Sequence, residues 1–311
     1  LETFVKYIGF QNWQQYKDYY NESALPETKQ NSWEVLKSRV RIITERSLNC
    51  IKLRADYNPQ KMIFRSFAKE KFEKFLQSPK TATLLSAPIG YGKSVILIQI
   101  IEHFFRGRNA ENNNDIVLLI DGGMFFNLFS RNSNIELLHQ FIDFNISSSQ
   151  EMYFQKNPEQ RKGRIVILFD NVDEVYFNKE KYQQFLENLA RIIMAYDNGH
   201  YKMLFTCRPE NVDVFASLVN KNPILESAWY DADFNKEMTH EISNIPLFSK
   251  DEIIQLLAKM KFEFDADKLD ENERLLKMIS HPYLLSLFVL AYHQNENITE
   301  IYLVKKYLEK T

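Results

Sequence analysis

The chain has 311 residues, of which 45% are hydrophobic and 26% are charged, and its formal net charge at pH 7 is -2. This length supplies enough apolar side chains for one large domain or two modest ones, and the balanced charge gives no broad basic field for nucleic-acid binding. Cys50 and Cys207 are the two cysteines, so a disulfide framework is excluded and a reducing, cytoplasmic compartment is expected. No apolar run approaches the roughly 20 residues that cross a bilayer, and no signal-peptide pattern opens the chain.

Residues 1–55 are expected to form a small helical segment at the N-terminus. Aromatic side chains recur about one helical turn apart between Phe4 and Tyr16, which indicates a packing face. Pro26 interrupts this pattern, and a second helix is predicted over residues 33–46.

Residues 56–245 are predicted to form the core of the protein. An amphipathic helix over 64–76 opens this region, and four short apolar runs follow it, at 83–86, 116–120, 165–169 and 203–206. A helix-length or mixed segment, rather than a two-residue hairpin turn, follows each run. Buried strands that alternate with helices predict an α/β fold in which helices cover both faces of a parallel sheet.

Residues 246–311 are expected to form a helical subdomain, because the strand patterns end there. Ser249 and Glu252 match a capping box in front of an apolar face at helical spacing. Two further helices are predicted over 273–279 and 283–292. The chain begins at Leu1 rather than Met and stops within a helical pattern, so we expect a fragment of a longer protein.

A glycine-rich segment joins the first apolar run to an apolar helix predicted over 95–105. The phosphate-loop pattern is G-x-x-x-x-G-K-[ST], and the chain matches it at Ala87-Pro88-Ile89-Gly90-Tyr91-Gly92-Lys93-Ser94, with alanine at the first glycine position. A G-K-S triplet alone is weak evidence, but a strand before it and a helix after it are the context that this loop needs. We therefore predict a nucleotide site that holds ATP or GTP with Mg²⁺.

Each residue type in this loop has a physical role. Glycines let the backbone curl so that successive N–H groups point at phosphate oxygens, and the N-terminus of the next helix adds its dipole. Lys93 is expected to reach the β and γ phosphates, and the Ser94 hydroxyl to supply an oxygen to Mg²⁺. The predicted nucleotide-binding residues are Ala87, Pro88, Gly90, Tyr91, Gly92, Lys93 and Ser94.

Three carboxylates follow the third apolar run. Asp170 comes directly after it, at the strand end where ligands bind in open parallel sheets, and hard cations prefer oxygen ligands. We therefore predict Asp170 as a Mg²⁺ residue, with Asp173 or Glu174 orienting or deprotonating the attacking water. The alternative is a solvated acidic turn, which the phosphate loop upstream disfavours.

A cation lies after the fourth apolar run, in Thr206-Cys207-Arg208-Pro209. Arg208 is placed to contact the γ-phosphate, although arginine in such a turn is also ordinary on a surface. Ser280-His281-Pro282 starts a helix with proline in its first turn, where the missing N–H costs nothing. No zinc-ligand spacing and no G-x-S-x-G motif occur.

The chain resembles the STAND class of signal-transduction NTPases, which includes the NACHT proteins. The acidic motif of that class is an apolar strand followed by Asp, a small residue, any residue and Asp-Glu, and residues 165–174 match it with Asn171 at the small position. Residues 87–94 are similar to the Ala-Pro-Ala-Gly-Tyr-Gly-Lys-Thr loop of the maltose-regulon activator branch. Residues 206–209 are similar to the Thr-Ser-Arg-Pro sensor of the class, and residues 281–285 to its helical-domain motif.

The resemblance implies a slow ATPase that uses ATP, ADP and Mg²⁺, in which Pro282 packs against the base and Arg208 senses the γ-phosphate. It implies a closed monomer that opens on nucleotide exchange or ligand sensing, self-associates and activates an effector, as in bacterial antiviral defence. The effector and sensor domains are then expected outside these 311 residues.

Two other function classes stay open. An AAA+ motor or loader is disfavoured because glutamate does not directly follow Asp170. A non-hydrolysing nucleotide scaffold, or a transcription-regulator module, is the binding alternative. Turnover separates the classes, since we expect rapid hydrolysis from a motor, slow hydrolysis from a switch and none from a scaffold.

Overall fold

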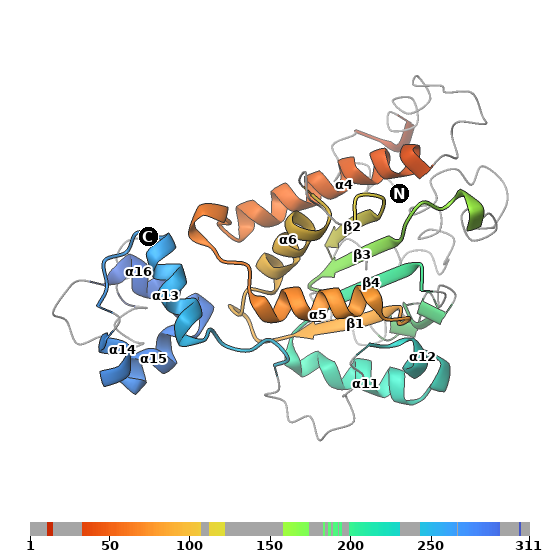
Figure 1. Ribbon diagram of the computed structural model, residues 1–311. Helices are drawn as coiled ribbons and strands as arrows, with labels where there is room; N and C mark the ends of the chain where they lie inside the picture. The colour runs from red at the N-terminus through yellow and green to blue at the C-terminus, as the bar shows by residue number, and fades with distance from the viewer. Residues whose placement is uncertain are drawn as a thin grey trace.

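The computed structural model describes most of the core and the helical region that follows it. The described residues are 11–14, 33–106, 112–121, 158–173, 183, 186–187, 189–191, 193–194, 199–230, 243–265, 267–292 and 305. They form an α/β structure with a parallel sheet at its centre and a group of helices at one end (Figure 1).

Within the described residues, one parallel sheet of four strands forms the centre of the core, in the order β1-β4-β3-β2. The strands are β1 (Ala82–Ser86), β2 (Ile116–Asp121), β3 (Ile165–Asp170) and β4 (Tyr201–Cys207). They coincide with the four predicted apolar runs apart from one or two residues at the ends. Because β1, β4 and β3 are parallel neighbours, the loop after β1 and the Asp170 carboxylate at the end of β3 lie at the same edge of the sheet.

Helices cover both faces of the sheet, as the uninterrupted apolar strands predict. On one face, Leu85 and Leu204 pack against α5 (Ser66–Gln77) and α6 (Lys93–Phe104). On the other face, alternate strand residues pack against a hydrophobic cluster that includes α11 (Val212–Asn220) and α12 (Pro223–Ala228). Successive strand residues point to opposite faces, so a strand that is buried along its whole length needs cover on both.

Helix α4 (Trp33–Arg54) runs along β2, the strand at one end of the sheet order. The Thr44 hydroxyl donates to the Val117 carbonyl oxygen at 2.8 Å and accepts from the Leu119 N–H at 3.2 Å. One side chain thus satisfies backbone groups along that strand, which is how helices cover a sheet edge. The helix is eight residues longer than the predicted 33–46, and Ile51 continues its buried face.

The second half of the predicted N-terminal segment therefore packs directly on the sheet. The aromatic stripe between Phe4 and Tyr16 lies outside the described residues, except for Trp13, which packs against the core. The two predicted domain boundaries, after residues 55 and 245, stay predictions.

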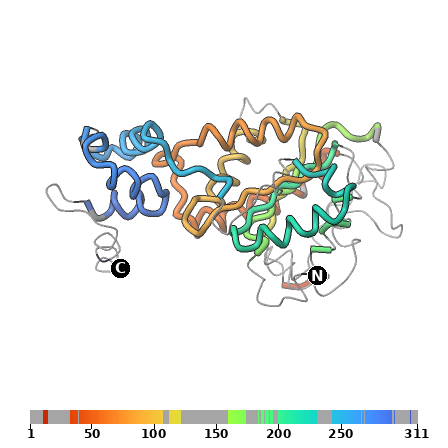
Figure 2. The backbone as a smooth tube through the Cα atoms, turned by 90° about the horizontal axis from the view of Figure 1, so that it is seen from below, coloured from red at the N-terminus to blue at the C-terminus, as the bar shows by residue number. Residues whose placement is uncertain are grey.

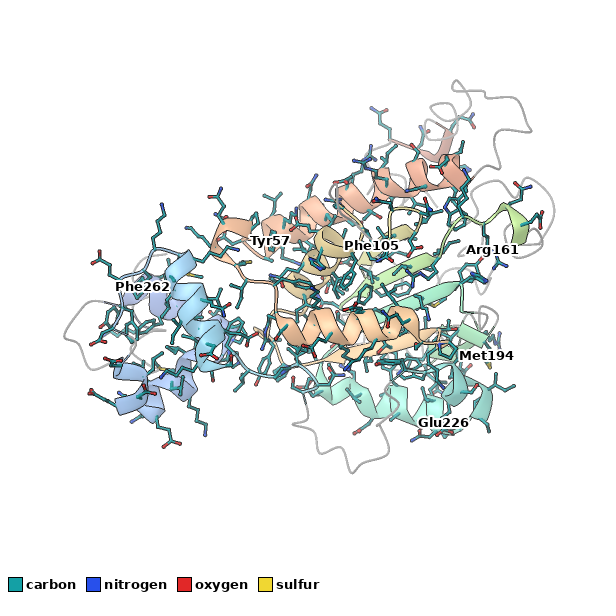
Figure 3. The ribbon with its side chains drawn as sticks, viewed as in Figure 1. Tyr57, Phe105, Arg161, Met194, Glu226 and Phe262 are labelled. Carbon is teal, nitrogen blue, oxygen red and sulfur yellow. The ribbon has the colours of Figure 1, made fainter. Side chains whose placement is uncertain are left out.

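Four helices of the described chain form the region that we call the helical lobe: α13 (Lys250–Lys259), α14 (Asp267–Glu271), α15 (Glu273–Ile279) and α16 (Pro282–Ala291). They share one apolar cluster, and the partly buried Phe262, labelled in Figure 3, packs against it. The capping box between Ser249 and Glu252 is confirmed. Figures 1 and 2 place this lobe at one end of the molecule, beyond the strands.

Three short 3₁₀ helices complete the described structure, at η1 (Pro59–Lys61), η2 (Pro158–Gln160) and η3 (Pro209–Asn211). Within the described part of the chain, no helix has both the length and the apolar character that crossing a membrane requires.

Candidate functional site

The glycine-rich loop after β1 has the backbone that its sequence predicts. Gly90 has φ 87° and Gly92 has φ 81°, values that side-chain-bearing residues rarely adopt. Gly92 is the N-cap residue of α6, so this helix begins at Lys93 and its first N–H groups open towards the loop. The methyl group of Ala87, at the position where the pattern has glycine, is buried in the core.

Lys93 lies under the loop rather than in solvent. Its Nζ donates to the carbonyl oxygens of Ala87 at 2.5 Å and Pro88 at 3.0 Å. The residue is only 7% exposed, and this burial lowers the pKa of the ammonium group because desolvation disfavours the charged form. A buried cation beside a curled backbone is suited to phosphate oxygens.

Asp170, at the end of β3, lies beside Ser94. The Ser94 hydroxyl lies 2.8 Å from Asp170 Oδ2 and 3.0 Å from Oδ1, and the Thr206 hydroxyl donates to Oδ1 at 3.1 Å. The carboxyl group is fully buried, and burial raises its pKa. A hydroxyl and a carboxylate at this separation are the oxygen donors that Mg²⁺ prefers, so the pair fits the predicted ion.

An arginine that the sequence did not indicate completes this cluster. Arg54, in the last turn of α4, donates from Nη2 to Asp170 Oδ2 at 2.8 Å, and its Nη1 lies 3.3 Å from Asp121. Asp121 and Asp170 are paired in register at the ends of β2 and β3. A basic residue at a helix C-terminus is common, so the sequence held no signal that this one reaches a site 116 residues away.

Asp173 is engaged by the turn after β4. Its Oδ2 accepts from the backbone N–H of Arg208 at 2.9 Å and from the Asn211 side-chain amide at 3.1 Å. The side chain is buried, and its oxygen lies 3.6 Å from Arg208 Nε. The water-orienting role of Asp173 stays a prediction, and the prediction for Glu174 lies outside the described residues.

Asn171 forms the turn between Asp170 and Asp173. Its φ is 56°, in the left-handed region where asparagine is tolerated better than most side chains. Its N–H donates to the Thr206 hydroxyl at 2.8 Å, which fixes the turn between Asp170 and Asp173.

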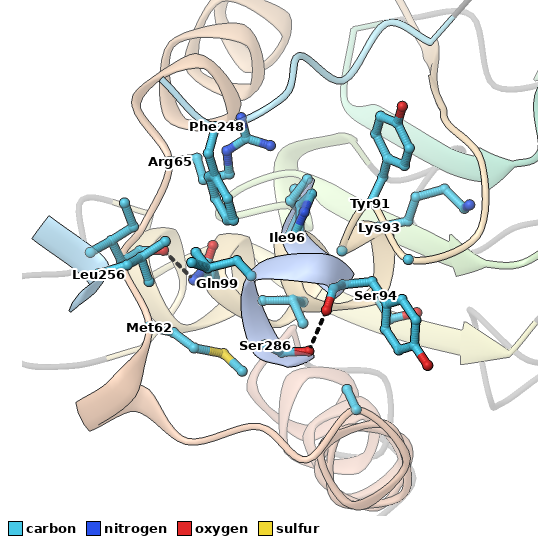
Figure 4. Close-up of a pocket in the computed structure, with 18 of the residues that line it drawn as sticks. Met62, Arg65, Tyr91, Lys93, Ser94, Ile96, Gln99, Phe248, Leu256 and Ser286 are labelled. Carbon is cyan, nitrogen blue, oxygen red and sulfur yellow. Dashed lines mark hydrogen bonds between the residues drawn. The ribbon is translucent and has the colours of Figure 1, made fainter. Parts of the chain in front are cut away.

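A cavity of about 540 Å³ lies between the core and the helical lobe (Figure 4). The predicted site residues that line it are Gly90, Tyr91, Gly92, Lys93, Ser94, Arg208 and Pro282. Arg54 and Asn171 line it too. Ala87, Pro88, Asp170 and Asp173 lie behind this lining and contact it through the hydrogen bonds given above. The structure thus gathers residues from 54 to 286 around one cavity.

The start of α16 lies directly on the loop. A Cβ atom added at Gly90 would stand 2.8 Å from the Tyr283 Cβ, closer than real Cβ contacts. The Tyr91 and His281 rings meet edge to face with their centroids 4.6 Å apart. The predicted helical-domain motif and the phosphate loop are therefore in contact.

Arg65 joins the two lobes beside the cavity. Its guanidinium lies 4.6 Å from the ring centroids of both Phe67 and Phe248. It donates to the Leu247 carbonyl oxygen at 2.9 Å and forms an ion pair with Glu252 at 3.3 Å. These contacts attach the start of α5 to the start of α13 at the boundary between the lobes.

Together, the parallel sheet, the loop that leads into α6 and the carboxylate at the end of β3 define a P-loop NTPase fold. Comparison with models of known protein families finds no match, and comparison with curated protein sequences finds none either. Among solved structures, the chain is similar to the Walker-type ATPase paby2304 of Pyrococcus abyssi, with 17% identity and a TM-score of 0.42 over 80% of this chain and 72% of that one. It is also similar to RIF2 of Saccharomyces cerevisiae, with 15% identity and a TM-score of 0.36 over 88% of this chain and 94% of that one.

Proposed function

We propose that this chain binds a nucleoside triphosphate with Mg²⁺ in the cavity between its lobes and hydrolyses it slowly. The observation that carries the proposal is the contact of 2.8 Å between the Ser94 hydroxyl and Asp170, beside a loop with a buried lysine. A nucleotide that binds with Mg²⁺ requires the hydroxyl, the carboxylate and the lysine together at one edge of the sheet.

The main site residues have separate roles in this proposal. Lys93 turns from the loop carbonyls to the β and γ phosphates, and the N–H groups of the loop bind the same oxygens. Ser94 and Asp170 hold Mg²⁺, which neutralises phosphate charge. Arg208, on the rim of the cavity, contacts the γ-phosphate. Asp173 or Glu174 orients the attacking water.

We further propose that the nucleotide sets the angle between the lobes. Arg208 belongs to the core and Pro282 to the helical lobe, and both line the same cavity. A ligand shifts such an equilibrium only by the difference between its affinities for the two arrangements. ADP favours closure of Pro282 over the base, whereas ATP draws Arg208 to the γ-phosphate and loosens that closure. Self-association and a role in antiviral defence stay predictions of the STAND resemblance.

Small-angle scattering with saturating ADP, and with a non-hydrolysable ATP analogue, tests the switch. We expect a larger radius of gyration with the analogue, and no difference between the two nucleotides in Lys93→Ala. Identical scattering in protein shown to be saturated would contradict a switch within this chain. Turnover assays on the same samples separate a slow switch from a rapid motor and from a scaffold without hydrolysis.

A further inference from the structure

Gln99 is a polar side chain in the middle of an apolar helix. It lies on α6, six residues after Lys93, and is 94% buried, since only 6% of its surface is exposed. It lines the cavity between the lobes, where Figure 4 shows it on the same helix as Ile96. Glutamine is mostly exposed in folded proteins, so its position calls for a polar partner.

The orientation of the Gln99 amide follows from its neighbour. The amide nitrogen Nε2 donates to the Ile63 carbonyl oxygen at 2.6 Å. A carbonyl oxygen only accepts hydrogen bonds, so the nitrogen must be the atom that faces Ile63. The carbonyl oxygen of Gln99, Oε1, is therefore directed elsewhere.

Gln99 Oε1 is buried and has no hydrogen-bond partner within the described part of the chain. Buried acceptors in native proteins nearly always have a donor, because leaving one unpaired is costly. Oε1 is not solvent-accessible, so a ligand in the cavity supplies the donor when the Gln99 side chain shifts towards it.

The surroundings of Gln99 suit the flat ring of a nucleobase. The cavity is apolar around it, with Met62 and Ile96 from the core and Leu256, Met260 and Leu285 from the helical lobe. The phosphate loop lies at the start of α6, and six residues of helix span about 9 Å. This separation is of the order of the reach of a nucleoside from its phosphates to the far edge of its base.

On the basis of the proposed nucleotide binding, we propose that Gln99 reads the base and selects adenine. Its Oε1 accepts a hydrogen bond from the exocyclic amino group at C6 of adenine. Guanine carries a carbonyl oxygen at that position, so two acceptors would face each other and both would stay unpaired. Sites built to pair with a substrate donor discriminate strongly against analogues that lack it. The ligand is thus ATP or ADP rather than the guanine nucleotides.

Calorimetric titrations with three triphosphates test this assignment in the presence of Mg²⁺: ATP, GTP and purine riboside 5′-triphosphate, which has no group at C6. For the wild-type protein we expect GTP and the purine analogue to bind at least about tenfold more weakly than ATP, the cost of one unpaired buried acceptor. In Gln99→Leu the three affinities converge. The lost contact with Ile63 affects all three nucleotides alike, so the ratio of affinities is the readout.

Gln255→Leu is the matched control, because this glutamine lies on the exposed side of α13 and does not line the cavity. It should keep the wild-type preference for ATP. If Gln99→Leu does not fold, as checked by thermal unfolding, the wild-type comparison of ATP with the purine analogue decides alone.

Two results separate this inference from the proposed function. Equal affinity of the wild-type protein for ATP and the purine analogue, or full discrimination in Gln99→Leu, overturns the role of Gln99 while Lys93-dependent ATP binding stands. Failure of every triphosphate to bind overturns the proposed function, and the role of Gln99 with it.

Discussion

Arg54 Nη2 lies 2.8 Å from Asp170 Oδ2, which links the last turn of α4 to the carboxyl end of β3. Asp170 is fully buried, whereas the arginine side chain is 46% exposed. The arginine lowers the pKa of the carboxyl group, but desolvation is the larger effect, so the pKa is raised above its usual range. Burial in the folded protein therefore disfavours the charged form of Asp170 at this edge of the sheet.

The stability of the nucleotide-free protein should depend on pH through Asp170. Since the pKa in the folded state exceeds that in the unfolded state, this group's contribution to stability is complete below the unfolded pKa and is lost as pH rises through the folded pKa. Asp170→Asn does not ionise there. We expect its free energy of unfolding, measured in urea without Mg²⁺, to improve relative to wild type as pH rises from about 4 to about 7. If the difference in unfolding free energy between Asp170→Asn and wild type stays constant or falls as pH rises, the burial effect on Asp170 is contradicted.

Arg54→Ala should enlarge the same pH dependence, because it removes the cation that opposes the desolvation of Asp170. Arg41→Ala on the same helix is the control, since that side chain is 79% exposed and pairs only weakly with Glu45 at 3.8 Å. Equal pH profiles for the two variants would count against a role of Arg54 at this carboxylate.

Gly90→Ala should separate the two lobes. The added methyl group would stand 2.8 Å from the Tyr283 Cβ, so α16 must move away from the loop. Gly199→Ala is the control, because its φ of 73° is strained in the same way and nothing lies within 4 Å of the added atom. In both variants an alanine at a positive φ costs about 1–3 kcal/mol of backbone strain. We expect only Gly90→Ala to increase the radius of gyration. The same radius in both variants would contradict the contact.

Substitutions of the acidic pair should distinguish its structural and chemical roles. Asp173→Ala leaves the Arg208 N–H and the Asn211 amide without their acceptor, so we expect a loss of about 1–3 kcal/mol in unfolding free energy. Asp173→Asn keeps one oxygen acceptor and should fold, as should Glu174→Gln. If either carboxylate orients the attacking water, its amide variant binds ATP normally but hydrolyses it more slowly. If Asp173→Asn and Glu174→Gln both hydrolyse ATP at the wild-type rate, the two carboxylates have a structural role only.

Local patterns in the sequence were enough to predict the strands and the phosphate loop. A strand buried on both faces and a loop with left-handed glycines each leave their pattern within a short segment. β3 was predicted almost to the residue, and the capping box at Ser249 was predicted with its partner. The extension of α4 to Arg54 was not, although Ile51 continues its apolar face. The role of Arg54 depends on tertiary contact alone, since nothing near it in the chain marks it as a partner of Asp170.

Other misses did have a signal. Val212, Phe215 and Val219 are buried at helical spacing on α11, which was predicted only as a segment of unspecified type. Gln99 interrupts an otherwise apolar helix, and a single polar residue in such a place indicates a buried hydrogen bond. Its significance needed the structure, because only there does Gln99 both contact Ile63 and line the cavity.

The two cysteines should differ in reactivity towards a disulfide reagent. Cys50 is exposed on α4, whereas Cys207 is buried at the end of β4, where burial raises the pKa of its thiol. The thiolate is the reactive form, so we expect one thiol to react in the native protein and the second only after unfolding. Rapid reaction of Cys207→Ser and slow reaction of Cys50→Ser would assign them. If both thiols of the native wild-type protein react rapidly with the reagent, the burial of Cys207 at the end of β4 is contradicted.

Binding of ATP with Mg²⁺ to wild type and to Lys93→Ala, measured by titration calorimetry, tests nucleotide binding at the loop most directly. Lys93 is the buried cation of the loop, and charge-assisted bonds to phosphate are strong. We expect its removal to weaken binding at least about a hundredfold, or about 2.8 kcal/mol. Lys69→Ala, at an exposed position on α5, should bind as wild type does. Wild-type affinity in Lys93→Ala would contradict the assignment of the phosphate loop, and with it the proposed function.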